Sequence, residues 1–135
     1  MTLIRLAALL AAVSLLAGCN SAGRGGGPTE EGYVLFQEVN DLLRAAAGPS
    51  GRPPAKVADL KAHEANFPRA YGAIKSGSVV VIWGTPFKGE GEASSGDPVV
   101  AYEQAVPTGG GYVLLAGGEV KKMSASEFQS APKAK

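Results

Sequence analysis

The hydrophobic pattern of this chain changes halfway along it. Between Tyr33 and Ala47, apolar side chains recur at the spacing of an amphipathic helix, at Leu35, Val39, Leu42 and Ala46, with Val34 and Leu43 beside them. From residue 78 onward, the apolar residues are mostly β-branched or aromatic and come in short runs separated by Gly and Pro. This order predicts an α+β fold, with the helix lying across one face of an antiparallel meander.

A second, shorter helix is expected over residues 55–67, ended by Pro68. Four or five strands are expected after it, at residues 69–75, 78–83, 99–103, 112–116 and 119–123. The run from Ser78 to Trp83 is apolar on both faces, which predicts a central strand rather than an edge strand.

Turn and capping residues mark the end of the chain. Gly117-Gly118 predicts a tight two-residue hairpin. Ser124 and Glu127 have the spacing of a capping box, which predicts a short C-terminal helix carrying Phe128. We expect one small domain over residues 33–130, interrupted by a long polar loop from Gly84 to Pro98, and a frayed tail at residues 131–135.

The N-terminus has the hydrophobic pattern of an export signal. Leu6 to Ala17 is a run of twelve residues, apolar except for Ser14, that would form a helix only about 18 Å long, too short to cross a bilayer. It ends in Leu16-Ala17-Gly18-Cys19, which resembles the lipobox of bacterial lipoproteins. The resemblance implies removal of residues 1–18 by a signal peptidase and a diacylglyceryl group on the Cys19 thiol. The alternatives are a plain secretory peptide with an incidental free Cys, or a buried structural Cys.

Residues 19–32 are predicted to connect this lipid to the domain. The segment after Cys19 is rich in Gly and Ser, and its composition is that of a flexible tether. The expected partner is therefore the membrane, through the lipid on Cys19, with two or three acyl chains giving a stable anchor. Asn20, rather than Asp, follows the Cys, which by the same resemblance favours the periplasmic face of the outer membrane where the cell has one.

The closing residues resemble part of another envelope family. Tyr112 to Val120 is similar to the last hairpin of pilin-like and pseudopilin-like proteins, in which an apolar strand, an Asp-Gly turn and a Val-containing strand precede a short helix. In this chain Gly117-Gly118 replaces Asp-Gly, and a lipobox replaces the prepilin cleavage site. The long hydrophobic helix of filament subunits would also be missing after processing. The resemblance implies a similar fold more than a shared function.

Charge and cysteine content exclude two classes of protein. Arg5 is the only charged residue in the first 18, so the mature chain would keep 12 basic and 12 acidic residues of the 13 and 12 in the full sequence. A neutral domain has no electrostatic attraction to nucleic acid, and none is expected as a partner. Cys19 is the single cysteine, so no intrachain disulfide is available.

The residues of this chain do not predict catalysis, a metal centre or a cofactor. His63 is the only histidine, and no Cys or carboxylate stands at ligand spacing from it. Neither glycine run, at residues 25–27 and 109–111, has the context of a phosphate-binding loop. Glu90, Glu92 and Asp97 offer one alternative, a site for a hard cation in the polar loop, although their spacing is not that of an EF-hand.

The remaining candidates are aromatic. Trp83, Phe87 and Tyr102 are candidate residues for a ligand or partner surface, although Trp83 has an alternative as a core residue and Phe87 as the residue that holds the loop. The leading hypothesis is a non-enzymatic envelope lipoprotein that binds a partner or contributes to an assembly. The alternative is a domain that binds a small ligand or a carbohydrate in a pocket lined by these rings, followed by a small enzyme.

Overall fold

A computed structural model describes residues 28–89, 92–94 and 96–135. Its elements are α1 (Pro28–Ala47), the 3-10 helix η1 (Val57–His63), α2 (Pro68–Ser76), β1 (Val79–Val81), β2 (Val99–Glu103), α3 (Val106–Gly109), β3 (Gly111–Leu115), β4 (Val120–Met123) and α4 (Ala125–Ser130). The strands form one antiparallel sheet in the order β1-β2-β3-β4. The predicted α+β fold, with an amphipathic first helix, a meander and a short last helix, is confirmed.

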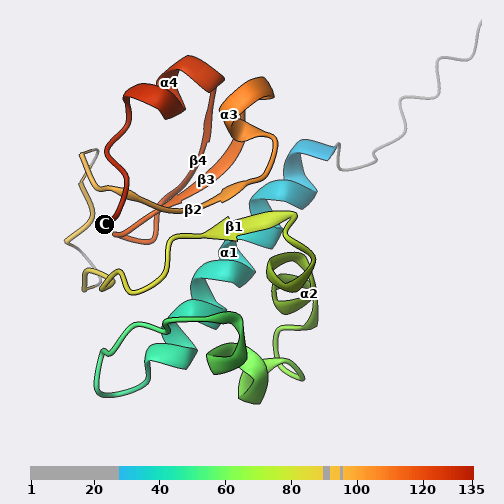
Figure 1. Cartoon of the computed structure of the whole chain (residues 1–135), viewed down its shortest axis with the longest axis vertical. Coiled ribbons are helices and arrows are strands. Elements are labelled where there is room, and N and C mark those ends of the chain that lie inside the picture. Colours follow the sequence, from blue (N-terminus) through green and yellow to red (C-terminus); the bar gives the residue numbers. More distant parts are fainter. Residues whose placement is uncertain (1–27, 90–91, 95) are drawn as a thin grey trace, which may run out of the picture.

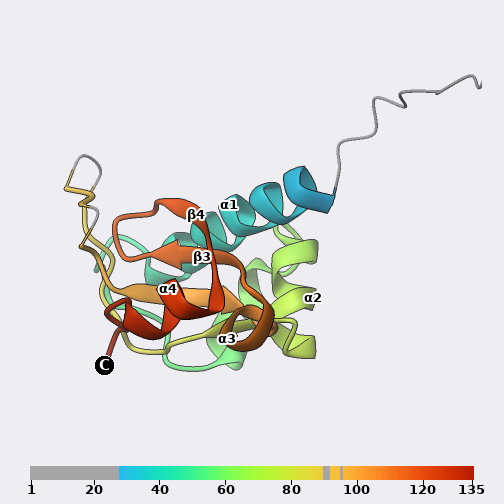
Figure 2. The same ribbon diagram turned by 90° about the horizontal axis from the view of Figure 1, so that it is seen from above.

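The sheet is covered by helices on both faces, which gives three layers (Figures 1 and 2). Helices α1 and α2 cover one face, and they enclose the larger of two apolar clusters. On the other face, α3 and α4 pack on β3 and β4 around a smaller cluster that includes Val106, Val113 and Phe128. The strands are three to five residues long, so neither face alone is wide enough for a large core.

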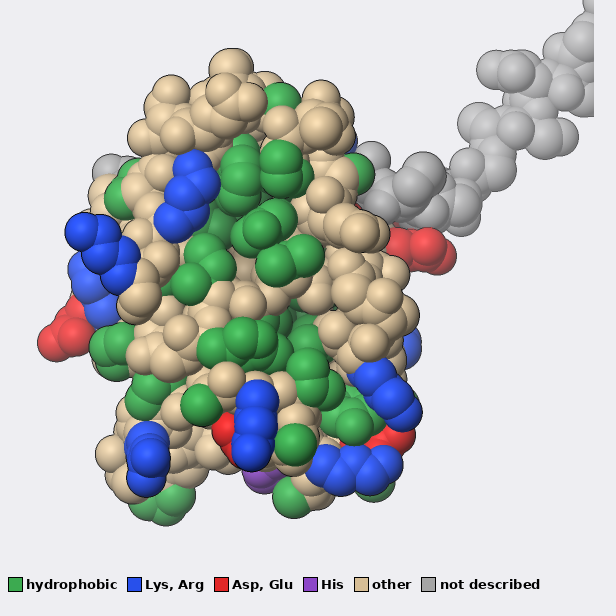
Figure 3. All heavy atoms as spheres, viewed as in Figure 1, with side chains coloured by type: hydrophobic (Ala, Val, Ile, Leu, Met, Phe, Trp, Pro, Cys, Tyr) green, Lys and Arg blue, Asp and Glu red, His purple; other side chains and the backbone are tan. Residues whose placement is uncertain are grey.

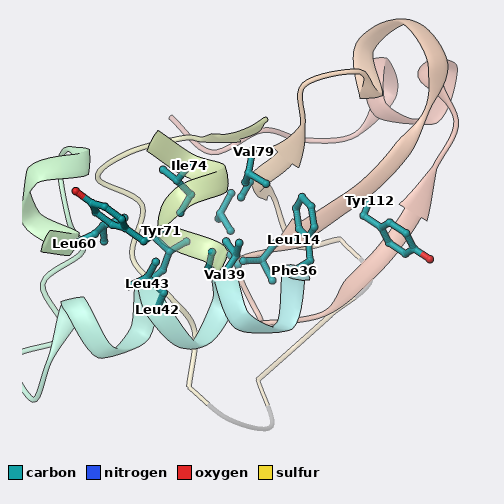
Figure 4. Packing of buried hydrophobic residues seen from close by; sticks show 14 residues of the cluster. Phe36, Val39, Leu42, Leu43, Leu60, Tyr71, Ile74, Val79, Tyr112 and Leu114 are labelled. Carbon is teal, nitrogen blue, oxygen red and sulfur yellow. The ribbon is translucent and has the colours of Figure 1, made fainter. Parts of the chain in front are cut away.

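The buried stripe of α1 holds the larger cluster together (Figure 4). Phe36, Val39 and Leu42 are fully buried and Leu43 is 1% exposed. Val39, Leu42 and Leu43 were expected in this stripe, whereas Phe36 was not. Val34, which was expected there, is 47% exposed because it lies two residues before Phe36, about 200° around a helix of 3.6 residues per turn.

The first helix begins earlier than the sequence predicted. Residues 28–32, assigned to the flexible tether, form the first turns of α1, while the rest of the expected tether lies outside the described residues. A proline is favoured in the first turn of a helix, and Glu30 and Glu31 lie where the helix dipole favours negative charge. Gly32 is packed rather than flexible, because a Cβ on it would come within 2.6 Å of the Tyr112 ring.

The second helical region also differs from the prediction. Only residues 57–63 of the expected helix are helical, and they form a 3-10 helix. Pro68 begins α2 instead of ending the preceding helix, so residues 69–75, predicted as a strand, are helical. Ala70, Tyr71 and Ile74 lie on one side of α2 and are all buried, which is helical rather than alternating spacing. Gly77 ends the helix in the left-handed conformation, at φ 83°.

The strand at Val79–Val81 lies at the edge of the sheet, not in its centre. The apolar character on both faces of this segment predicted a central strand. That prediction is wrong. Within the described residues β1 pairs with β2 alone, over three residues, and α2 packs on one of its faces. The run beyond it, Ile82 and Trp83, is half-buried.

The last hairpin uses three residues rather than the two predicted. Leu115 donates its N–H to the Glu119 carbonyl (2.9 Å), and Gly118 donates to the Leu115 carbonyl (2.8 Å). The chain therefore turns through Ala116, Gly117 and Gly118, with Gly118 at φ 91°, the conformation that a three-residue hairpin requires of its last position. The predicted capping box at Ser124 and Glu127 is confirmed, and Phe128 is buried.

The C-terminal tail is paired with the sheet, contrary to the expectation that it would fray. Val99 donates to the Pro132 carbonyl (2.8 Å), and Ala134 donates to the Val99 carbonyl (3.0 Å), which makes a parallel bridge at Lys133. The Lys133 ammonium also donates to carbonyls at the end of α4, including that of Ala131 (3.1 Å). These bonds use β2 backbone groups that lie beyond the end of β1.

The α1 stripe predicts a large difference between two neighbouring substitutions. Phe36→Ala removes a fully buried ring, and we expect it to lower the free energy of unfolding by about 3–5 kcal/mol. Val34→Ala, on the exposed side of the same helix, should change it by no more than about 0.5 kcal/mol. Urea denaturation of both variants measures the two values. Equal losses would show that this register of α1 is wrong.

Candidate functional site

Tyr112 lies between two adjoining hollows at the end of the domain where α1 begins. Its ring closes the large cluster, 6.4 Å from the Phe36 ring, and its hydroxyl points away from the packed side chains (Figure 4). One hollow, of about 740 Å³, is open and mostly walled by the glycine-rich bend and by β4. The other, of about 440 Å³, lies against the first turns of α1.

The larger hollow is built around the bend that joins α3 to β3. Glu103 accepts a hydrogen bond from the Tyr112 backbone N–H at 2.9 Å, which holds its carboxylate against Gly111. A Cβ on Gly111 would lie 2.1 Å from the Glu103 Oε2, and one on Gly110 would lie 2.8 Å from the Met123 carbonyl oxygen. Both glycines also have positive φ values, 76° for Gly110 and 154° for Gly111. Gly110 and Gly111 are therefore sites of close packing, a role that flexibility alone would not explain.

The charged groups of this hollow already have structural partners. Glu127 accepts from the Ser124 backbone N–H (2.7 Å), and hydrogen bonds from the Ser124 amide and hydroxyl lower the pKa of the Glu127 carboxyl. A general acid at neutral pH needs the opposite shift. The Lys122 ammonium lies 5.9 Å from the centre of the Tyr112 ring. The arrangement suits a contact surface better than acid–base chemistry.

The smaller hollow is apolar and exposed. Tyr33 and Val34 are 42% and 47% exposed, while Gln37 and Glu30 form its edge. The Tyr33 ring meets Tyr112 edge to face, with 6.4 Å between ring centres. Large side chains exposed side by side are typical of interaction surfaces. Tyr33 and Tyr112 were not among the site residues predicted from the sequence. The available signal was the position of Val34, about 200° around the helix from Phe36.

His63 does not belong to a catalytic arrangement of the described residues. It is half-buried at the end of η1. Figure 1 shows residues 57–63, the green segment that follows α1, at the opposite end of the domain from α3 and α4. Its backbone carbonyl accepts from Asn66 and Phe67 (both 3.1 Å), and within the described ranges its imidazole has no hydrogen-bond or ion-pair partner. A triad would require the imidazole to be held by a neighbouring group.

The three predicted aromatic residues do not share one pocket. Trp83 and Phe87 pack against the larger cluster, and Phe87 lies under the Arg44 guanidinium at 5.2 Å. The crevice beside Phe87 measures only about 10 Å³, room for a single water at most. Tyr102 packs on the other face of the sheet, with its ring centre 4.7 Å from that of Phe128.

The polar loop is folded back on the domain by Asp97. This carboxylate is 3% exposed, forms an ion pair with Lys88 and accepts from the Ser94 backbone N–H (3.0 Å) and hydroxyl (2.8 Å). Arg44 holds the same loop by donating to the Lys88 carbonyl (3.1 Å). Glu90, one member of the suggested cation site, lies outside the described residues. The oxygens of Asp97 are thus committed to the loop itself.

The buried carboxylate of Asp97 predicts an acid-sensitive contribution to stability. The bonds from Lys88 and Ser94 lower the pKa of Asp97 from 3.8 to about 2. Because this folded-state pKa is lowered, the stabilisation is complete above about pH 5 and is lost as the pH falls from about 4 to about 2. Asp97→Asn should therefore be less stable than the wild type at pH 7, and the difference should shrink over that acid range.

Urea denaturation at a series of pH values measures this difference. Lys88→Met is the matched variant, because removal of the ammonium raises the pKa of Asp97 and should move the acid loss to higher pH. A constant difference between wild type and Asp97→Asn down to pH 2 would contradict the assignment.

Leu16, Ala17, Gly18 and Cys19 lie outside the described residues, so the lipobox remains a prediction from the sequence. Within the described part of the chain, no helix has both the length and the apolar character needed to cross a membrane. The same residues contain no group of three or more His, Cys, Asp or Glu side chains placed to hold a metal ion. Models of protein families, curated proteins and solved structures were compared with the chain, and none of them matches it significantly.

Proposed function

We propose that this chain is a bacterial envelope lipoprotein, anchored through lipid on Cys19, whose domain is non-enzymatic and binds a protein partner. The observation that carries the binding role is the exposed pair Tyr33 and Val34, side by side with Tyr112 and its polar hollow. This surface, called the Tyr112 surface from here on, combines aromatic rings with a rim of charged groups, and protein interfaces likewise have aromatic residues at the centre and polar groups at the rim.

The position of this surface along the chain supports a role close to the membrane. Residues 20–27 separate Cys19 from the start of α1, and a chain of that length spans at most about 30 Å. The first turns of α1 are therefore the part of the domain closest along the chain to the lipid. A partner in the same membrane, or attached to it, would meet Tyr33 and Val34 at a raised effective concentration.

A protein partner fits the surface better than a small ligand. A small-ligand site usually encloses most of its ligand, whereas both hollows beside Tyr112 are wide and shallow. The rings of Trp83, Phe87 and Tyr102, which the small-ligand alternative required, are used in packing on two faces of the sheet. The similarity of residues 112–120 to the closing hairpin of pilin-like proteins is in line with a role in an envelope assembly.

Lipid attachment is tested by Cys19→Ala. Without the thiol, the chain cannot receive a diacylglyceryl group, so we expect no incorporation of labelled palmitate and no cleavage after Gly18. Mass spectrometry of the membrane fraction should show a wild-type chain that begins at Cys19 and carries added lipid mass. Ser21→Ala, two residues away, should behave as the wild type. A wild-type chain that begins elsewhere or lacks lipid would refute the anchor. It would not contradict the partner surface, which has its own test.

The partner surface is tested by photo-crosslinking in intact cells. A benzoylphenylalanine placed at position 34 should give a discrete adduct, and the matched position 62, exposed on η1, should not. The additional change Tyr33→Ser should remove most of the adduct because it deletes the exposed ring that adjoins Tyr112. The same adducts from positions 34 and 62, or an adduct that survives Tyr33→Ser, would contradict this surface.

A further inference from the structure

The two edges of the sheet differ in how well they are protected from other strands. The β4 edge carries Lys121 and Lys122, and charged side chains are a common protection against pairing with other strands. The β1 edge has no such protection. From Ser78 to Trp83 the sequence is SVVVIW, without charge or proline and with strong preference for extended structure.

The backbone of β1 has hydrogen-bonding groups that point away from the sheet. Gln104 donates to the Ser78 carbonyl (2.9 Å) and Ile82 donates to the Val100 carbonyl (2.8 Å). Because hydrogen-bonded positions alternate along an antiparallel strand, the N–H and C=O groups of Val79 and Val81 face outward. Within the described residues, these outward groups have no hydrogen-bond partner.

The side chains beside this edge are apolar. Val80 lies opposite Tyr102, and both side chains are half-buried. They lie on the face of the sheet where α3 and α4 pack, but those helices cover mainly β3 and β4. Figure 2 places β1 on the outer side of the sheet. In Figure 3, apolar side chains gather in the middle of the face over β1, between the helical layers, with most charged side chains toward its margins. An apolar centre with a polar rim is the usual anatomy of an interface.

We propose that β1 pairs with the β1 strand of a second copy of this chain, in an antiparallel arrangement with its two-fold axis at Val80. In this register the outward groups of Val79 meet those of Val81 of the second copy, and the reverse contact follows from symmetry. Both outward positions of each strand are then satisfied. A second copy also brings an uncharged, β-branched strand to an uncharged, β-branched strand.

This pairing does not depend on the proposed lipid anchor or on the Tyr112 surface. It extends the sheet of each copy across the axis and keeps the helical layers of the two copies on matching sides. Val80 of one copy lies directly opposite Val80 of the other, at a position that is not hydrogen-bonded. Such positions have Cα atoms about 4.5 Å apart, which is within the range of a disulfide.

The first test uses Val80→Cys in the full chain. Under mild oxidation it should give a reducible dimer on a gel, whereas Gln129→Cys, exposed on α4, should not exceed the background measured with the wild-type chain. A yield from Val80→Cys no higher than that from Gln129→Cys would overturn the proposal.

The second test measures dimerisation of the full chain, purified from membranes, by sedimentation equilibrium in density-matched detergent. Val81→Pro deletes an outward N–H, and proline is tolerated at such edge positions. Loss of that donor from both copies should raise the dissociation constant at least about tenfold. Val81→Ala is the matched control, because it keeps the N–H, and it should remain close to the wild type.

Circular dichroism establishes that each variant is folded before its association is interpreted. A wild-type chain that is monomeric at every concentration would overturn the proposal. Association that Val81→Pro leaves unchanged would also overturn it. That result is expected if the copies associate through a different interface, or if β1 pairs with a strand of another protein.

Discussion

The packing of one face of α1 onto a small sheet is the contact on which the rest of this structure depends. Strands of three to five residues cannot form a stable layer by themselves, and the chain has no disulfide to support them. Phe36, Val39 and Leu42 supply fully buried side chains to that face. Their burial fixes the rotation of α1, and this rotation in turn places Tyr33 and Val34 in solvent beside Tyr112.

Much of this packing was predictable from the sequence, because the spacing of apolar residues indicates which side of a helix or strand is buried. The α+β class, the amphipathic first helix, the strands at residues 99–103 and 112–116 and the Ser124 capping box all followed from local patterns. The boundary at Pro68 did not, since a proline is compatible with both the end of one helix and the first turn of another. Residues 69–75 are too few to distinguish the two periods with certainty.

Glycine was the residue type whose role the sequence concealed most. Gly32 follows a segment rich in glycine and was assigned to the tether, yet its lack of a side chain allows the Tyr112 ring to approach α1. Gly110 and Gly111 likewise allow Glu103 and the Met123 carbonyl to approach the bend. Flexibility and close approach both require glycine, and only the position of the neighbouring element distinguishes them. The Tyr112 surface depends on neighbours that are distant in the sequence, so no local motif predicts it.

The edge position of β1 could not be predicted from its residues alone. An apolar run is expected of a central strand, but it is also expected of an edge strand that pairs with another chain. Pairing at β1 would resolve this conflict, because the strand would then lie inside a continuous sheet. It would also leave the Tyr112 surface free, since Tyr112 lies on β3, two strands away from the edge. If that two-fold axis lay along the membrane normal, both copies of α1 would lie at equal height, and the two proposed lipid anchors could enter the same bilayer. The dimer would then present two partner surfaces from one membrane site, and a bivalent partner would bind it more tightly than either copy alone.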